Sequence, residues 1–238
     1  MQSLAGSRTF CLSLLLSALV AGIPARFGGV ASAGTIDIWS LPSNGSNNIT
    51  VANVSVTPSP AWYMPAAGSG FEWISYTDSG CNEFNPITGR CTPGPGNPPA
   101  TTVTGTPTAI FYQTFTLTAA ASGDLDVWAD DTAGVWLDTG TVTSGDGSGG
   151  TLLEAPNGNL GPNCANGPIG CLPGNGGAIP LSLSAGTYTL VFDVYQLVSS
   201  TPFGLMYDGV LSTPEPASYM LMGLGLAALG VFARRRKR

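Results

Sequence analysis

The chain has 238 residues, of which 43% are hydrophobic and 9% are charged, and its formal net charge is −6. Histidine is absent, which excludes Ser-His-Asp and Cys-His catalytic triads and every metal site with an imidazole ligand. Residues 34–213 hold 13 acidic residues and a single basic one, Arg90, which gives this segment a net charge of −12. A segment with one cation cannot neutralise several phosphates, so nucleic-acid binding is excluded for it.

The first 33 residues have the layout of a secretory signal peptide. Arg8 precedes an apolar run from Phe10 to Ile23, and Ala31-Ser32-Ala33 supplies the small residues of a cleavage site before Gly34. The alternative is an N-terminal membrane anchor, but the run has 14 residues and a spanning helix needs roughly 18 or more. We therefore predict cleavage after Ala33 and export of the rest of the chain.

The C-terminal end carries three elements in a fixed order. Pro214-Glu215-Pro216 comes first, the apolar stretch Ala217–Ala233 follows, and five basic residues end the chain. As a helix the 17 apolar residues would cover roughly 26 Å, near the lower limit for a transmembrane span. The terminal cations would then stay on the cytoplasmic side. A plain tail anchor is the alternative interpretation of these features.

This order of elements resembles the PEP-CTERM sorting signal over residues 213–238. The resemblance implies that an exosortase recognises the tail in the inner membrane and cuts near Pro214, Glu215 and Pro216. It also implies a destination at the cell surface or in the extracellular matrix of a bacterium that makes extracellular polysaccharide. The expected parts are a signal peptide (1–33), an exported domain (34–212) and a sorting tail (213–238). The expected partners are the exosortase, the inner membrane transiently, and the polysaccharide.

Apolar residues of the exported segment alternate with polar ones, and β-branched and aromatic residues are common, as is typical of strands. We expect an all-β fold, a single antiparallel β-sandwich with jelly-roll-like connectivity, and a helix only in the transmembrane part of the tail. The predicted strands are Thr35–Trp39, Ile49–Val56, Phe71–Tyr76, Ala109–Thr118, Asp124–Ala129, Val135–Asp138, Ile179–Leu183, Tyr188–Gln196 and Gly204–Tyr207.

Two long irregular stretches, 77–107 and 140–177, each contain a pair of cysteines. Export brings them into an oxidising compartment, where disulfides persist. Four cysteines allow three connectivities, and we favour Cys81 with Cys91 and Cys164 with Cys171 because each bridge closes a short loop. A zinc site is the alternative, but the spacing differs from that of zinc ribbons. The stretches are therefore expected to be stapled surface loops, with ligand binding as the other interpretation.

The segment Gly123–Asp138 concentrates aspartates and tryptophans in two predicted strands. If Leu125 and Val127 point inward, then Asp126, Trp128 and Asp130 point outward. A hairpin with the five-residue turn Asp130–Gly134 would place Trp128 opposite Trp136 and Asp126 opposite Asp138. Because directly opposed like charges are unfavourable, this face requires a calcium ion, a ligand or cover from a loop.

Calcium is the expected cofactor of this face, and its expected ligands are Asp126, Asp130, Asp131 and Asp138. The outward tryptophans, Trp128 and Trp136, are the residues expected to stack on a sugar. The alternative is that the stretch 140–177 covers both tryptophans while the aspartates face water.

Residues Phe111–Asp138, together with Leu183–Leu190, resemble the protective-antigen-type β-sandwich that fungal adhesins share. In the adhesin members paired aspartates help to hold calcium and a sugar, and the resemblance implies that role for Asp130 and Asp131. The chain departs from the pattern at Asp138, because Thr139-Gly140 follows where the family has glycine directly.

The leading hypothesis is a non-catalytic surface protein that associates with extracellular polysaccharide, with calcium-dependent glycan binding. A purely structural matrix protein without a discrete site is the main alternative. A carboxylate-dependent glycan-active enzyme is a further one, since such enzymes need only two suitably spaced acids, and Glu72, Glu83 and Glu154 are available.

Overall fold

The computed structural model describes residues 34–40, 54–88, 90–159, 164, 167–199, 201–213, 225 and 234–235. The described residues 225, 234 and 235 are helical, and the described residues between 34 and 213 form twelve strands and two short 3-10 helices. Their bounds are β1 Thr35–Trp39, β2 Val54–Ser55, β3 Ile74–Ser75, β4 Cys81–Asn85, β5 Arg90–Pro93, β6 Ala109–Leu117, β7 Ala121–Asp130, β8 Thr132–Thr139, η1 Gly147–Gly149, β9 Thr151–Glu154, η3 Pro173–Asn175, β10 Gly177–Leu183, β11 Gly186–Tyr195 and β12 Gly204–Ser212.

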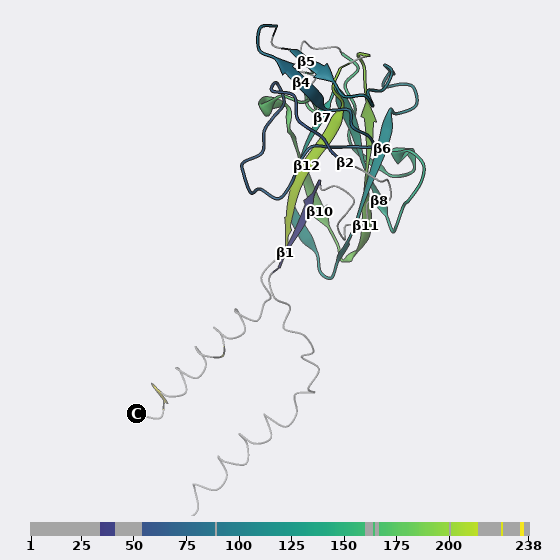
Figure 1. The fold of residues 1–238 in the computed structure, drawn as a ribbon. Helices are drawn as coiled ribbons and strands as arrows, with labels where there is room; N and C mark the ends of the chain where they lie inside the picture. The colour runs from purple at the N-terminus through teal and green to yellow at the C-terminus, as the bar shows by residue number, and fades with distance from the viewer. Residues whose placement is uncertain are drawn as a thin grey trace, which may run out of the picture. The chain divides into compact units, whose positions relative to one another are not determined.

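The strands form two main antiparallel sheets and one small one (Figure 1). The first sheet has the order β10-β7-β12-β3-β2, and β1 also pairs with β12. The second sheet has the order β6-β11-β8-β9, and β4 pairs with β5 in a separate two-stranded sheet. The described strands are thus antiparallel throughout, as expected, whereas the jelly-roll-like connectivity stays a prediction.

A single apolar core lies between the two main sheets, because each strand turns every second side chain toward the other sheet. On β7 the inward residues Leu125, Val127 and Ala129 are fully buried, as the alternation predicted. The rings of Phe192 on β11 and Tyr207 on β12 stack across this core with centroids 4.4 Å apart. The Tyr207 hydroxyl donates to Oε1 of Gln113 on β6 at 2.6 Å, so this polar pair is satisfied inside the core.

The sequence predicted most long strands within a few residues, and the largest misses fall in the stretches expected to be irregular. The stretch 77–107 contains the hairpin β4–β5, and the stretch 140–177 contains β9 and both 3-10 helices. In the predicted strand 49–56, only β2 is described and residues 49–53 lie outside the described part. Glycine- and asparagine-rich composition hid these elements, because propensity is a weak signal for short strands.

Both cysteine pairs form the local bridges that the sequence favours, Cys81 with Cys91 and Cys164 with Cys171. The first links β4 to β5, so the hairpin is tied across its own strands. The second closes a small loop at the end of the sandwich, before η3. The second bridge is buried in a separate apolar cluster with Trp62, Trp73, Trp128 and Met206.

The predicted signal peptide and sorting tail fall almost entirely outside the described residues, including the motif Pro214, Glu215 and Pro216. Within the tail only Thr213, Gly225, Arg234 and Arg235 are described. Within the described residues no helix has the length and hydropathy needed to cross a membrane. The transmembrane helix and the processing boundaries thus stay predictions.

Candidate functional site

The two predicted strands of the acidic segment do not form a hairpin, and this corrects the sequence interpretation. β7 belongs to the first sheet, where it pairs with β10 and β12, whereas β8 belongs to the second sheet, where it pairs with β11 and β9. The chain therefore crosses from one sheet to the other at Asp130-Asp131. Trp128 lies opposite Met206, and Asp126 lies opposite Asp208, so neither faces the partner that a hairpin would give.

Alternation alone could not reveal this crossing. The inward residues Leu125, Val127 and Val135 are buried as expected, because both strands turn the same alternating face toward one shared core. A hairpin within one sheet and a connection between two facing sheets produce the same pattern of buried and exposed positions. The difference lies in the hydrogen-bonded partners, which come from β11 and β12, far along the sequence.

Both tryptophans of the acidic segment lie under glycine-containing loops. The Trp128 ring is 7% exposed and stacks on Tyr63, with centroids 4.4 Å apart. A Cβ on Gly176 would lie 2.4 Å from the Trp128 indole, and one on Gly147 would lie 2.0 Å from Trp136. The loops of the stretch 140–177 thus cover the rings, which was the alternative interpretation. The expected stacking of Trp128 on a sugar is therefore blocked in this arrangement.

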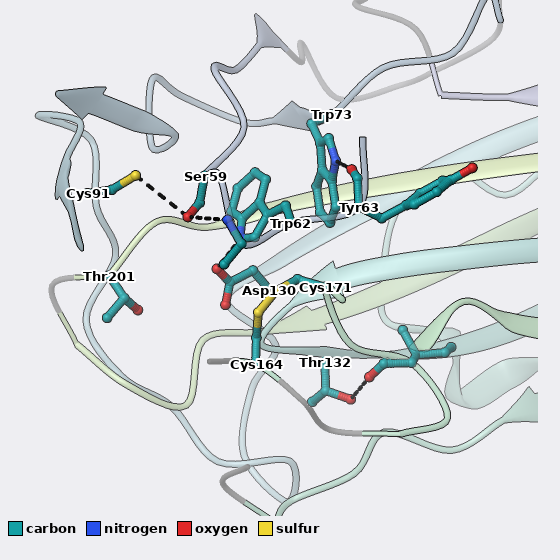
Figure 2. The surroundings of a disulfide bond; sticks show 12 residues. Ser59, Trp62, Tyr63, Trp73, Cys91, Asp130, Thr132, Cys164, Cys171 and Thr201 are labelled. Carbon is teal, nitrogen blue, oxygen red and sulfur yellow. Dashed lines mark hydrogen bonds between the residues drawn. A yellow bond between two sulfur atoms is a disulfide. The ribbon is translucent and has the colours of Figure 1, made fainter. Parts of the chain in front are cut away.

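Asp130, the last residue of β7, is 5% exposed and lies beneath a cluster of aromatic side chains (Figure 2). Its Oδ2 accepts a hydrogen bond from the indole Nε1 of Trp62 at 2.7 Å. Trp62 packs in turn against Trp73, with ring centroids 4.2 Å apart. The loop that carries Trp62 therefore fixes one oxygen of this carboxylate and shields it from water.

Asp131 is also 5% exposed, and backbone groups from the end of β11 hold it in place. Its Oδ2 accepts from the N–H of Leu197 at 2.7 Å and from that of Val198 at 3.0 Å. The preceding residue, Gln196, is 0% exposed, and its side-chain Oε1 is buried without a hydrogen-bond partner in the described part of the chain. A buried amide oxygen without a donor is unusual and marks a place that a cation or water suits.

The two adjacent carboxyl groups also contact each other. Burial raises the pKa of Asp130 well above its ordinary value, and the neighbouring charge and hydrogen bond of Asp131 raise it further. The hydrogen bond from Trp62 acts in the opposite direction. No basic residue of the described domain compensates this pair, because Arg90 is the one cation of residues 34–213 and it lies exposed on β5. The pair must therefore retain a proton or bind a cation.

The other two predicted ligands lie elsewhere. Asp126 points to the outer face of the first sheet, where burial and then Asp124 raise its pKa. Asp208 lies opposite it, and burial, Asp126 and Asp37 raise the pKa of that carboxyl. Asp138 pairs with Thr189 on β11 in the second sheet. The structure thus keeps only Asp130 and Asp131 of the predicted four together.

Among the described residues, one set of three potential metal ligands lies within 4.8 Å of one another, and it consists of Asp130, Cys164 and Cys171. The two cysteines are bonded to each other as a disulfide, so their sulfurs are not thiolate ligands. Carboxylate and amide oxygens remain the available donors at this corner, and hard cations such as calcium prefer those donors.

The sequence interpretation missed a third buried carboxylate, Asp193 on β11, which lies on the outer face of the second sheet under the loop of η1. Both of its oxygens accept from the Gly147 N–H, at 3.1 and 3.3 Å. Burial raises its pKa to about 6, with a smaller contribution from Asp146, while the hydrogen bonds from Gly147 and Trp136 lower it. An aspartate between Phe192 and Val194 in a run of strand residues was the available signal.

Fold and site together define a disulfide-containing antiparallel β-sandwich with a buried aspartate pair where the chain crosses between its sheets. Residues 212–237 match the PEP-CTERM protein-sorting motif. The chain therefore carries the sorting signal of exosortase substrates, which identifies an exported surface protein. No curated protein and no solved structure matches the chain significantly.

Proposed function

We propose that this exosortase-sorted protein is a non-catalytic β-sandwich that binds one calcium ion at Asp130 and Asp131 and, in that form, associates with the extracellular polysaccharide. The observation that carries the proposal is a pair of adjacent carboxylates, each 5% exposed, in a domain whose one basic residue lies elsewhere. Calcium takes six to eight oxygen ligands. The two carboxylates supply oxygens of the right kind, and backbone carbonyls and water would complete the shell.

A calcium ion at this corner would join three separate segments of the chain. Asp130 is tied to the loop of Trp62, and Asp131 is tied to the segment after β11. The Cys164–Cys171 bridge lies beside the same carboxylate (Figure 2). Ordering these loops together would shape one end of the sandwich, which is where such folds usually present their ligand-binding loops.

The proposal predicts that calcium stabilises the folded protein. An ion that binds only the folded state adds about 2.7 kcal/mol when its concentration is a hundred times its dissociation constant. Thermal melts with calcium and with chelator should therefore differ by several degrees, and the double variant Asp130→Asn, Asp131→Asn should lose the difference. The matched control Asp124→Asn, Asp126→Asn removes the same charge from the same strand and should keep it. Identical wild-type melts in both conditions would refute the calcium site.

Co-sedimentation with the surface polysaccharide tests the glycan part separately. Wild-type protein should sediment with the polymer in calcium and stay in solution with chelator. The cover over Trp128 favours the second candidate, a structural matrix protein without a discrete site. That candidate predicts neither a calcium-dependent melt nor calcium-dependent sedimentation, whereas a calcium-dependent melt without calcium-dependent sedimentation would refute the glycan part of the proposal alone.

A further inference from the structure

Strand β6 forms an open edge of the second sheet. It pairs with β11 on one side, and no strand of the described part pairs with its other side. The remaining edges carry features that oppose the addition of a strand. β2 has two residues, β9 has four and ends in Glu154, β1 contains Asp37, and β10 contains Pro180. β6 has nine residues and contains neither proline nor a charged residue.

The hydrogen bonds of β11 show which backbone groups of β6 face the open side. The Val194 carbonyl accepts from the Thr108 N–H next to β6, whereas the Tyr195 carbonyl accepts from the Asp131 N–H next to β8. The backbone N–H and C=O groups of even-numbered β11 residues therefore point toward β6. These residues lie opposite odd-numbered residues of β6, whose backbone groups point back toward β11. The backbone N–H and C=O groups of Ile110, Tyr112, Thr114 and Thr116 consequently point to the open edge. None of these groups has a hydrogen-bond partner in the described part of the chain.

The charge pattern indicates which partner fits this edge. The domain carries a net charge of −12, yet no charged residue occurs from Cys91 to Gly123. A second copy of the chain would present the same uncharged strand, so the two strands would meet without opposing carboxylates. An antiparallel pair about a two-fold axis satisfies the groups of both edges at once.

We propose that two copies of this protein associate through antiparallel pairing of their β6 strands, which joins the two second sheets into one continuous sheet. Tyr112 of each copy lies opposite Thr114 of the other, and Ile110 lies opposite Thr116. This register engages all four outward residues of each strand. The β-branched residues Ile110, Thr114 and Thr116 suit such cross-strand pairs, whereas the Tyr112 side chain is buried, donates its hydroxyl to the Gly145 carbonyl and contributes its backbone groups alone. The inference is independent of the proposed calcium site.

Sedimentation velocity of the exported protein, released from the cell surface, tests the proposal over a range of concentrations. Wild-type protein should change from monomer to dimer as the concentration rises. Thr116→Pro removes an outward N–H without breaking the ladder to β11, and it should abolish the dimer. The matched control Ser182→Pro places a proline at an exposed position of β10, an edge that already contains Pro180, and it should dimerise as the wild type does.

Amide hydrogen exchange supplies a test that needs no variant. Protection of the Ile110, Tyr112, Thr114 and Thr116 amides should increase with protein concentration together with the dimer fraction. Protection at every concentration would show that another part of the chain covers the edge, and it would overturn the proposal. A wild-type protein that stays monomeric, or a Thr116→Pro variant that dimerises normally, would also overturn it.

Discussion

Replacement of Asp193 by asparagine should change how the stability of this protein depends on pH. The folded protein raises the pKa of this carboxyl from 3.8 to about 6, chiefly because the side chain is buried beneath the η1 loop. The groups around it are Asp146 on that loop, Tyr112 on β6 and Tyr195 on β11, and Trp136 on β8 donates to it. None of these groups is a cation, so the ionised form of Asp193 has no countercharge.

The sign of the effect follows from proton binding. Between pH 3.8 and about 6 the folded state binds more protons at Asp193 than the unfolded state does. The free energy of unfolding therefore decreases as the pH rises through this window, and the stabilisation present at low pH is lost above about pH 6. The shift of the Asp193 pKa from 3.8 to about 6 corresponds to about 3 kcal/mol in the free energy of unfolding over the whole window. About half of this free energy is lost below about pH 5, so between about pH 5 and about pH 8 we expect roughly 1 to 2 kcal/mol.

Urea unfolding of wild type and Asp193→Asn at about pH 5 and about pH 8 measures the effect. Asparagine resembles the protonated acid and carries no charge, so the free energy of unfolding of the variant should not fall in this window as that of wild type does. From the lower to the higher pH, the stability of the variant relative to wild type should therefore increase by roughly 1 to 2 kcal/mol. Asp146→Asn is the matched control, because hydrogen bonds from Ser148 lower the pKa of the exposed Asp146, which is therefore ionised in both the folded and the unfolded state at these pH values. This variant should keep most of the wild-type pH dependence, reduced only by the part of the raised Asp193 pKa that Asp146 causes. If the free energies of unfolding of wild type and Asp193→Asn differ by the same amount at both pH values, the pKa of Asp193 is not raised in the folded protein.

Two further predictions concern covalent structure and processing. Non-reducing peptide mapping should recover Cys81 linked to Cys91 and Cys164 linked to Cys171, and each short loop should contribute about 2 to 3 kcal/mol by the loop-entropy model. Any cross-linked pair between the two loops would contradict the packing described above. Mass spectrometry of the surface-exposed protein should detect no peptide beyond about residue 216, because the PEP-CTERM match extends over residues 212–237 and an exosortase cuts within it. Recovery of an intact Arg238 end from that pool would show that the tail is a permanent anchor.

The sequence was sufficient for properties that local patterns determine. Alternation identified the long strands β6, β7, β11 and β12 and the inward faces of β7 and β8. It could not determine which strands pair, because pairing depends on contacts between residues far apart in the chain. The expected hairpin failed for this reason, since β7 and β8 lie in different sheets.

The candidate site was predictable only in part. Asp130 and Asp131 stood out as adjacent carboxylates in a strongly acidic segment, and they lie together at the crossover. Trp62 bonds Asp130 from a position 68 residues away, and the Leu197 and Val198 amides bond Asp131 from positions 66 and 67 residues away. No sequence spacing links those positions. Asp193 was missed because a single aspartate in an apolar run gives no sign of the loop that buries it.

Terbium luminescence tests the calcium site at the Asp130–Asp131 corner most directly. Terbium replaces calcium in oxygen-ligand sites and emits when a nearby excited indole transfers energy to it. The Trp62 indole donates to Asp130 at 2.7 Å, so an ion on this carboxylate would lie beside an efficient sensitiser. A calcium site at this corner predicts saturable emission on tryptophan excitation, which calcium displaces and which the double variant Asp130→Asn, Asp131→Asn lacks. Absent emission, or equal emission from the double variant, would contradict it.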